Sequence, residues 1–131
     1  MNITRAKDIT AVTAPAEYFV GAVSMEALHR PDGPAGTSAL RVHFEAGART
    51  NWHTHPEGQL LIVVAGEGWT RTAGEAKQVI RPGDVVWFPA GERHWHGATA
   101  TSAMVHVAVQ GSVDGQSAVW QEPVSDEDYL G

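Results

Sequence analysis

Two pairs of histidines in this chain have the spacing of metal ligands. His53 and His55 are separated by one residue in the stretch NWHTHPEGQ, and His94 and His96 are separated in the same way in GERHWH. On extended backbone, side chains two positions apart project to one face, and Gln59 shares the parity of the first pair. Imidazole nitrogens suit manganese, iron, nickel, copper and zinc, and three of them with one amide oxygen leave an octahedral ion with open positions. The alternative is a set of histidines with no common role, but two such pairs favour a metal site that a substrate can reach.

Short strands separated by turns are the elements that must position these side chains. Strand patterns cover residues 18–28, 37–47, 59–74 (two strands), 76–98 (three strands) and 102–111. The turn sequences RPGD and PAGE separate strands, because proline fixes φ and glycine accepts positive φ. The acidic stretch VSDEDYLG predicts one helical turn with Ser125 as its N-cap. Many short strands at even spacing indicate an all-β protein of one domain, a sandwich or a barrel.

Composition and charge exclude several classes of protein. The chain has no cysteine, so it can have no disulfide, thiolate zinc site or cysteine nucleophile. Its net charge of −6 offers no basic surface to a nucleic acid. The N-terminal stretch lacks the apolar core of a signal peptide, and no apolar run approaches the ~20 residues that span a bilayer. We therefore expect a cytoplasmic protein that binds neither nucleic acid nor membrane.

Two longer motifs surround the histidines. The first places Gly47, His53, His55, Gln59 and Gly66 at intervals of five, one, three and six residues. The second places Gly83, Pro89, Gly91 and His94 at intervals of five, one and two residues. In these spacings the chain resembles the cupin superfamily. The resemblance implies a double-stranded β-helix, or jelly-roll, barrel over residues 1–131, with a metal-binding core at about 37–111. It also implies four metal ligands: His53, His55, Gln59 and His94.

The chain departs from the usual cupin pattern at two positions. Cupins usually have glutamate at the position of Gln59 and asparagine at that of Ala98. An ion bound by neutral ligands alone keeps its full +2 charge, which makes it a stronger Lewis acid and disfavours oxidation to the +3 state. Gln59 therefore favours non-redox chemistry. In the alternative, Gln59 does not bind the metal and water takes its position.

A closer resemblance covers three stretches: GARTNWHTHPEGQLLIVVAGEGW, IRPGDVVWFPAGERHWHGA and TSAMVHVAVQ. These are similar to the small bacterial cupins that act as manganese-dependent hydroxynitrile lyases. The resemblance implies reversible cleavage of a cyanohydrin, a small-molecule substrate, to an aldehyde and hydrogen cyanide. It further implies one divalent ion, Mn(II), with Fe(II), Ni(II) and Zn(II) as alternatives. A histidine near the metal would move the proton. Fold similarity alone does not fix the reaction.

The strand MVHVAVQ alternates between two kinds of face. Its valines at 105, 107 and 109 share a face that should pack into an outer layer or against a partner subunit. His106 lies on the opposite, mixed face and is the preferred general base, since histidine transfers protons near neutral pH. Its alternative is a buried structural histidine. His96 is a second candidate for proton transfer or orientation, or a residue at the rim, and Gln110 could bind cyanide or a carbonyl group, or cap the strand.

Three side chains on the 37–47 strand share a face: Leu40, Val42 and Phe44. We expect them to form an apolar wall that accepts an aromatic ring, although ordinary core packing would place them in the same way. His43 has the opposite parity and should face outward, as should His29. The five tryptophans are expected in the core or at interfaces.

Three other functions share the same fold and ligand types. One is an iron-dependent dioxygenase, another is a non-redox isomerase, cyclase or sugar lyase, and a third is a binding or storage protein without catalysis. Cupin barrels commonly pair through edge strands, which predicts a homodimer or homotetramer.

Overall fold

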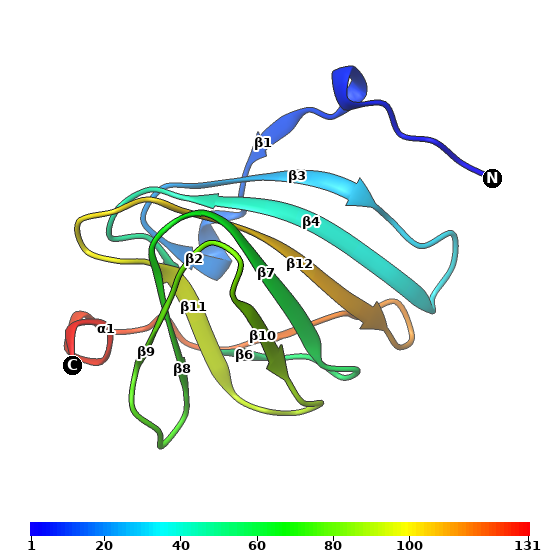
Figure 1. Cartoon of the computed structure of the whole chain (residues 1–131). Helices are drawn as coiled ribbons and strands as arrows, with labels where there is room; N and C mark the ends of the chain where they lie inside the picture. Colours follow the sequence, from blue (N-terminus) through cyan, green and yellow to red (C-terminus); the bar gives the residue numbers. More distant parts are fainter.

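The computed structural model describes residues 1–131 and contains two antiparallel β-sheets that face each other (Figure 1). The first sheet has the order β1 (Ala11–Thr13), β3 (Val23–His29), β4 (Gly36–Phe44), β12 (Met104–Ser112), β7 (Gln59–Gly66) and β10 (Val85–Phe88). The second has the order β13 (Val119–Trp120), β6 (His53–Thr54), β11 (His94–Ala98), β5 (Arg49–Thr50) and β2 (Phe19–Val20). In this second sheet, β11 also pairs with β8 (Gly68–Thr72), and β8 pairs with β9 (Gln78–Ile80). The expected all-β jelly-roll class is confirmed.

Helical structure is limited to three short segments: η1 (Ala6–Asp8), η2 (Ala16–Tyr18) and α1 (Asp126–Leu130). Ser125 caps α1 as predicted, because its side chain accepts a hydrogen bond from the backbone N–H of Asp128. None of these segments has the length and apolar character that a helix needs to cross a membrane. The N-terminal arm runs along the outside of β3 (Figure 1).

Alternating burial on β12 sets the two faces of the first sheet. Met104, His106, Ala108 and Gln110 are buried, while the valines between them are partly exposed, as predicted. Phe44 and Val42 of β4 and Val63 of β7 join Met104 in the main apolar cluster between the sheets. The inner face of β4, β12 and β7 thus changes from apolar residues at one end to polar residues at the other.

The expected strand over residues 18–28 is wrong, because Gly21 interrupts it. Gly21 has φ +85°, and a Cβ at this position would approach the Cα of Ala48 to 2.9 Å. The chain therefore turns and divides the segment, so that β2 joins the second sheet and β3 joins the first. This division places Phe19 at the boundary between the sheets, next to Phe44.

The C-terminal segment is anchored to the back of β11 and β5. The Tyr129 hydroxyl donates a 2.7 Å hydrogen bond to the carbonyl of Ala98. The Arg49 guanidinium lies 4.4 Å from the Tyr129 ring centroid and donates to the carbonyl of Val124 at 2.6 Å. Trp95, between the two histidines of β11, is fully buried on this side. These contacts hold the strand that carries His94 and His96 from behind.

Candidate functional site

The histidines of both sequence pairs converge between the sheets. His94 of β11 lies opposite His53 of β6 in the strand register, and their ring centroids are 4.3 Å apart. The expectation that His53, His55 and Gln59 share one extended strand is wrong. A turn at Gly58, with φ +79°, ends the first segment, so Gln59 opens β7 in the other sheet. The amide therefore reaches the histidines from across the barrel.

Three of the histidines are oriented in the same way by backbone carbonyls. Each donates its Nδ1–H: His53 to Asn51 at 2.9 Å, His55 to Ser117 at 2.6 Å and His94 to Glu92 at 2.9 Å. A hydrogen bond of this kind fixes the tautomer and leaves the Nε2 lone pair free, which is the usual arrangement of metal-bound histidine. The Nε2 atom of His55 is buried and has no hydrogen-bond partner. These donors fit a divalent metal ion.

A chain of hydrogen bonds orients the Gln59 amide. Ser38 Oγ accepts a 2.7 Å hydrogen bond from Gln110 Nε2, and Gln110 Oε1 accepts one of 3.0 Å from Gln59 Nε2. The amide nitrogen of Gln59 thus faces Gln110, and its carbonyl oxygen lies 3.4 Å from the Nε2 of His94. An oxygen that faces the histidine cluster is suited to bind the same ion.

His96 and His106 form a separate pair. The Nε2 of His106 and the Nδ1 of His96 are 2.9 Å apart, so one nitrogen donates and the other accepts. The second nitrogen of each ring, Nε2 of His96 and Nδ1 of His106, is buried without a partner. His53, His94 and His96 each have one ring nitrogen that lies within 4.8 Å of such a nitrogen in the other two. His96 therefore lies close to two candidate metal ligands, His53 and His94, and also contacts His106.

Burial keeps these five histidines neutral. Desolvation lowers the pKa of His94 and of His106 to about 3. Desolvation also lowers the pKa of His55. It lowers the pKa of His53 and of His96 well below the ordinary value, and repulsion from neighbouring histidine charges adds to the effect. A neutral imidazole is the form that binds a metal or accepts a proton. The cluster is therefore in the metal-binding form at neutral pH, whereas a pKa of about 3 makes His106 a weaker base than the near-neutral histidine that the sequence predicts.

A cavity of about 100 Å³ lies beside the cluster. All of the candidate catalytic and pocket residues line it: Leu40, Val42, Phe44, His96, His106 and Gln110. His53, His55 and Gln59 also line it, whereas His94 does not. As expected, His43 is partly exposed on the outer face, and His29 is exposed. The cavity thus has a polar end at the histidines and an apolar end at β4.

Seven lining residues were not identified as site residues from the sequence: Phe19, Met25, Thr50, Ala108, Ser117, Ala118 and Trp120. The Trp120 ring packs 4.6 Å from the His53 ring, although tryptophans were expected only in the core or at interfaces. Thr50 accepts a hydrogen bond from the backbone N–H of His96. Except for Met25 of β3 and Ala108 of β12, these residues lie on two-residue strands or on the segment after β12, where no motif or alternation marks them. For Phe19, the glycine at position 21 was the one local sequence feature that could have indicated a break in the strand.

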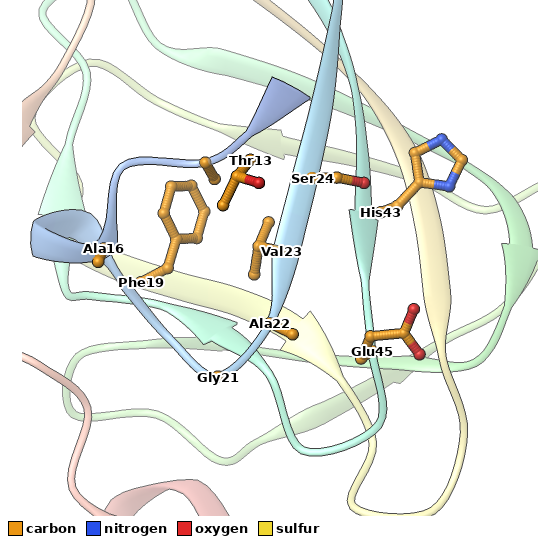
Figure 2. A pocket seen from close by; sticks show the side chains of 10 residues that line it. Thr13, Ala16, Phe19, Gly21, Ala22, Val23, Ser24, His43 and Glu45 are labelled. Carbon is orange, nitrogen blue, oxygen red and sulfur yellow. The ribbon is translucent and has the colours of Figure 1, made fainter. Parts of the chain in front are cut away.

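A larger groove of about 290 Å³ lies outside the barrel, between the N-terminal arm and β3 (Figure 2). Figure 2 shows Phe19 among its lining residues, together with His43 and Glu45 at the far side. The His43 Nε2 already contacts the Glu26 carboxylate at 2.9 Å, so this ring nitrogen is not a free polar group of the groove. Phe19 lines both the groove and the inner cavity, and therefore forms a wall between them.

Comparisons with known proteins agree with this geometry. The family model described as "Cupin domain" matches residues 40–110. An (R)-mandelonitrile lyase from Granulicella tundricola is 49 % identical over 98 % of each chain. The crystal structure of a cupin-like protein from Thermotoga maritima is 36 % identical over 89 % of each chain, with a TM-score of 0.82. The polyketide cyclase RemF from Streptomyces resistomycificus, 16 % identical, covers 98 % of this chain and 90 % of its own, with a TM-score of 0.76, and shows the fold alone. The chain belongs to the cupin family.

Proposed function

We propose that the protein is a metal-dependent hydroxynitrile lyase that cleaves or forms cyanohydrins. The observation that carries this proposal is the cavity that joins a neutral histidine and glutamine cluster to an apolar wall. It is supported by the 49 % identity to an (R)-mandelonitrile lyase. A cyanohydrin has a polar hydroxyl and nitrile at one carbon and an apolar substituent, which matches the two ends of this cavity.

The proposed metal ligands are His53, His55, Gln59 and His94. The three carbonyl-oriented imidazoles and the Gln59 oxygen are neutral, so a bound divalent ion would supply strong Lewis acidity to the hydroxyl or cyanide group. Mn(II) is the proposed ion, because carboxamide oxygen with imidazole suits it, and Fe(II), Ni(II) and Zn(II) are the alternatives. His96 is not assigned as a ligand, since its Nδ1 faces His106 rather than a carbonyl.

The His96–His106 pair is the proposed proton-transfer group. If His106 donates Nε2–H to His96 Nδ1, then His106 Nδ1 keeps a lone pair and His96 Nε2 keeps a hydrogen. His106 Nδ1 would take the proton of the cyanohydrin hydroxyl while the bond between carbon and cyanide breaks and the aldehyde forms. The same proton then passes to cyanide, which leaves as hydrogen cyanide. Gln110 and His96 Nε2–H would hold the nitrile or carbonyl group.

Three side chains are proposed as the substrate wall: Leu40, Val42 and Phe44. They lie on the inner face of β4, opposite the buried residues of β12. This wall favours an aromatic aldehyde or another apolar aldehyde as the product.

Assembly as a homodimer or homotetramer and a cytoplasmic location stay predictions.

The test is release of benzaldehyde from racemic mandelonitrile at a pH low enough to suppress spontaneous breakdown. Manganese-loaded protein, chelator-stripped protein and His53→Ala are compared, with His43→Ala as a matched control on the outer face. We expect enantioselective release by the manganese-loaded wild type and by manganese-loaded His43→Ala. Chelator-stripped protein and His53→Ala should show none. If the loaded protein holds its metal but matches the buffer blank, the proposal is overturned, and oxygen consumption and sugar-derived substrates are tested instead.

A further inference from the structure

A carboxamide that binds a metal ion must be held in one of two orientations. The side chain of Gln59 keeps nearly the same shape when its oxygen and nitrogen exchange places, but only the oxygen has lone pairs for a cation. A carboxylate needs no such control, since both of its ends are oxygen. A ligand role for Gln59 therefore requires a group that fixes the direction of its amide.

The register of the first sheet places three polar side chains in one row. Gln110 of β12 lies directly opposite Ser38 of β4 on one side and directly opposite Gln59 of β7 on the other. Side chains opposite each other on neighbouring strands are close enough to interact. The next residue of the row is Phe88 of β10, which lies opposite Gln59 and stacks on the His94 ring. The row therefore crosses four strands and ends at the histidine cluster.

Ser38 sets the direction of each hydrogen bond along this row. Its Oγ accepts from the Nε2 of Gln110 at 2.7 Å, while its own hydrogen faces the backbone carbonyl of Gln110 at 3.5 Å. The backbone carbonyl of Ser38, which can only accept, lies 3.5 Å from the same Nε2. Gln110 thus turns its amide nitrogen to β4 and its oxygen to β7, where the oxygen accepts from Gln59 Nε2 at 3.0 Å. This leaves the oxygen of Gln59 toward the histidines.

The histidine cluster alone would favour the opposite direction of the Gln59 amide. His94 donates its Nδ1–H to the carbonyl of Glu92, so its Nε2 carries a lone pair. The Oε1 of Gln59 faces that nitrogen at 3.4 Å, and neither atom has a hydrogen to share. A reversed amide would donate its Nε2–H to His94 and occupy the lone pair that a metal ion needs. The row therefore maintains an arrangement of lone pairs that a cation would satisfy.

We propose that Ser38 is a positioning residue of the metal site, which acts through Gln110 to keep the Gln59 oxygen available to the metal ion. This inference rests on the ligand set of the proposed function but not on its reaction. The Ser38 side chain hydrogen-bonds to Gln110 alone. Any effect of Ser38 on metal binding must therefore pass through the Gln110 amide.

The first test is titration with Mn(II), followed by its electron paramagnetic resonance signal. Ser38→Ala should lower the Mn(II) affinity by about three- to tenfold, the change that corresponds to one neutral hydrogen bond. Ser38→Thr keeps the hydroxyl and should bind Mn(II) as tightly as the wild type. Ser112→Ala is the matched control, because Ser112 ends β12 opposite Gly36 and lies outside the row. It should leave the affinity unchanged.

A second measurement counts the water ligands of Mn(II) by their deuterium coupling in deuterated water. When the Gln59 oxygen turns away, water takes its position. Ser38→Ala should therefore show more water ligands than the wild type, whereas Ser38→Thr should show the same number.

Gln110→Glu separates positioning from a general structural role. A carboxylate accepts hydrogen bonds at both oxygens, so it needs no Ser38 to choose a direction. In the Gln110→Glu background, at a pH well above the ordinary pKa of a carboxyl group, Ser38→Ala should change the Mn(II) affinity by less than about twofold. A purely structural role of Ser38 would give the same loss in both backgrounds.

Three results would overturn the proposal: a wild type that binds no Mn(II), equal affinities of the wild type and Ser38→Ala, or equal losses in the two backgrounds. If Ser38→Ala does not fold, Gln110→Met takes its place in the titration, because it removes the same link and should lose at least as much affinity. The proposed reaction is decided separately. A chain that binds Mn(II) but cleaves no cyanohydrin would overturn the reaction alone.

Discussion

The Phe88 ring lies flat on the His94 ring, with centroids 3.5 Å apart and planes within 9° of parallel. Phe88 is the last residue of β10 and is almost fully buried. The carbonyl of Glu92 holds the Nδ1 edge of His94, and Phe88 covers one face of the ring. His94 therefore has little freedom to rotate, which is what a metal ligand needs.

Phe88→Leu should weaken metal retention because it removes this flat support. Loss of the ring from a packed site should also destabilise the metal-free protein by about 1–2 kcal/mol. The measurements are thermal unfolding and titration with Mn(II) followed by its electron paramagnetic resonance signal. Phe88→Tyr, which keeps the ring, is the comparison. Equal Mn(II) affinity in the wild type and Phe88→Leu would show that the stacking does not position His94.

Gln59→Glu should bind Mn(II) more tightly and turn over more slowly. The carboxylate adds a negative charge near the ion, which lowers its Lewis acidity. It also cannot donate to Gln110, so the chain of hydrogen bonds to Ser38 is broken at its first link. We expect a loss of at least about tenfold in kcat, or about 1.4 kcal/mol in the barrier. Faster turnover in the variant would contradict the role given to the neutral amide.

His106→Ala should lose activity without losing metal. General base catalysis typically contributes about 10²- to 10⁴-fold, so kcat should fall within that range. His53→Ala should lose both activity and metal, because His53 is a proposed ligand. Metal content by elemental analysis and benzaldehyde release are measured on the same samples. Parallel loss of metal in His106→Ala would instead make His106 a structural support of the cluster.

The metal-free protein should lose stability steeply as the pH falls below about 6.5, the ordinary pKa of histidine. Burial lowers the folded-state pKa of His94 and His106 to about 3, so in this window protons bind these side chains in the unfolded chain only. Their stabilising contribution is complete above the unfolded pKa and declines with falling pH by about 1.4 kcal/mol per pH unit for each histidine. Unfolding midpoints measured from pH 7.5 to pH 5 test this. A flat profile would show that the histidines titrate normally in the fold.

Phe19→Ala should widen the range of substrates. Phe19 separates the inner cavity of about 100 Å³ from the outer groove of about 290 Å³, so its truncation would join the two. The ratio of kcat/KM for a cyanohydrin of a two-ring aldehyde to that for mandelonitrile should rise by about tenfold or more. Ser24→Ala, which alters the outer groove alone, should leave the ratio unchanged. An unchanged ratio in Phe19→Ala would mean that the partition does not limit substrate size.

The sequence predicted the longer strands and the histidine cluster, because alternation and fixed turn residues are local signals. The alternating faces of β12 followed directly from the stretch MVHVAVQ. The two-residue strands β2, β5, β6 and β13 are too short to show a period. Gln59 was assigned to the correct cluster for an incomplete reason, since a turn at Gly58 rather than shared strand parity brings it there. Trp120 could not be predicted, because its contact with His53 joins segments far apart in the sequence.

One contact concerns the order in which the protein is made. The carbonyl that orients His55 belongs to Ser117, in the segment after β12, and the neighbouring Trp120 covers His53. This segment follows every proposed metal ligand in the chain and is therefore synthesised after all of them. A chain that lacks this segment would contain the complete histidine motif without the carbonyl and the ring that hold two of its members. A metal site with all of its supports in place consequently requires the segment after β12, although that segment supplies none of the proposed ligands.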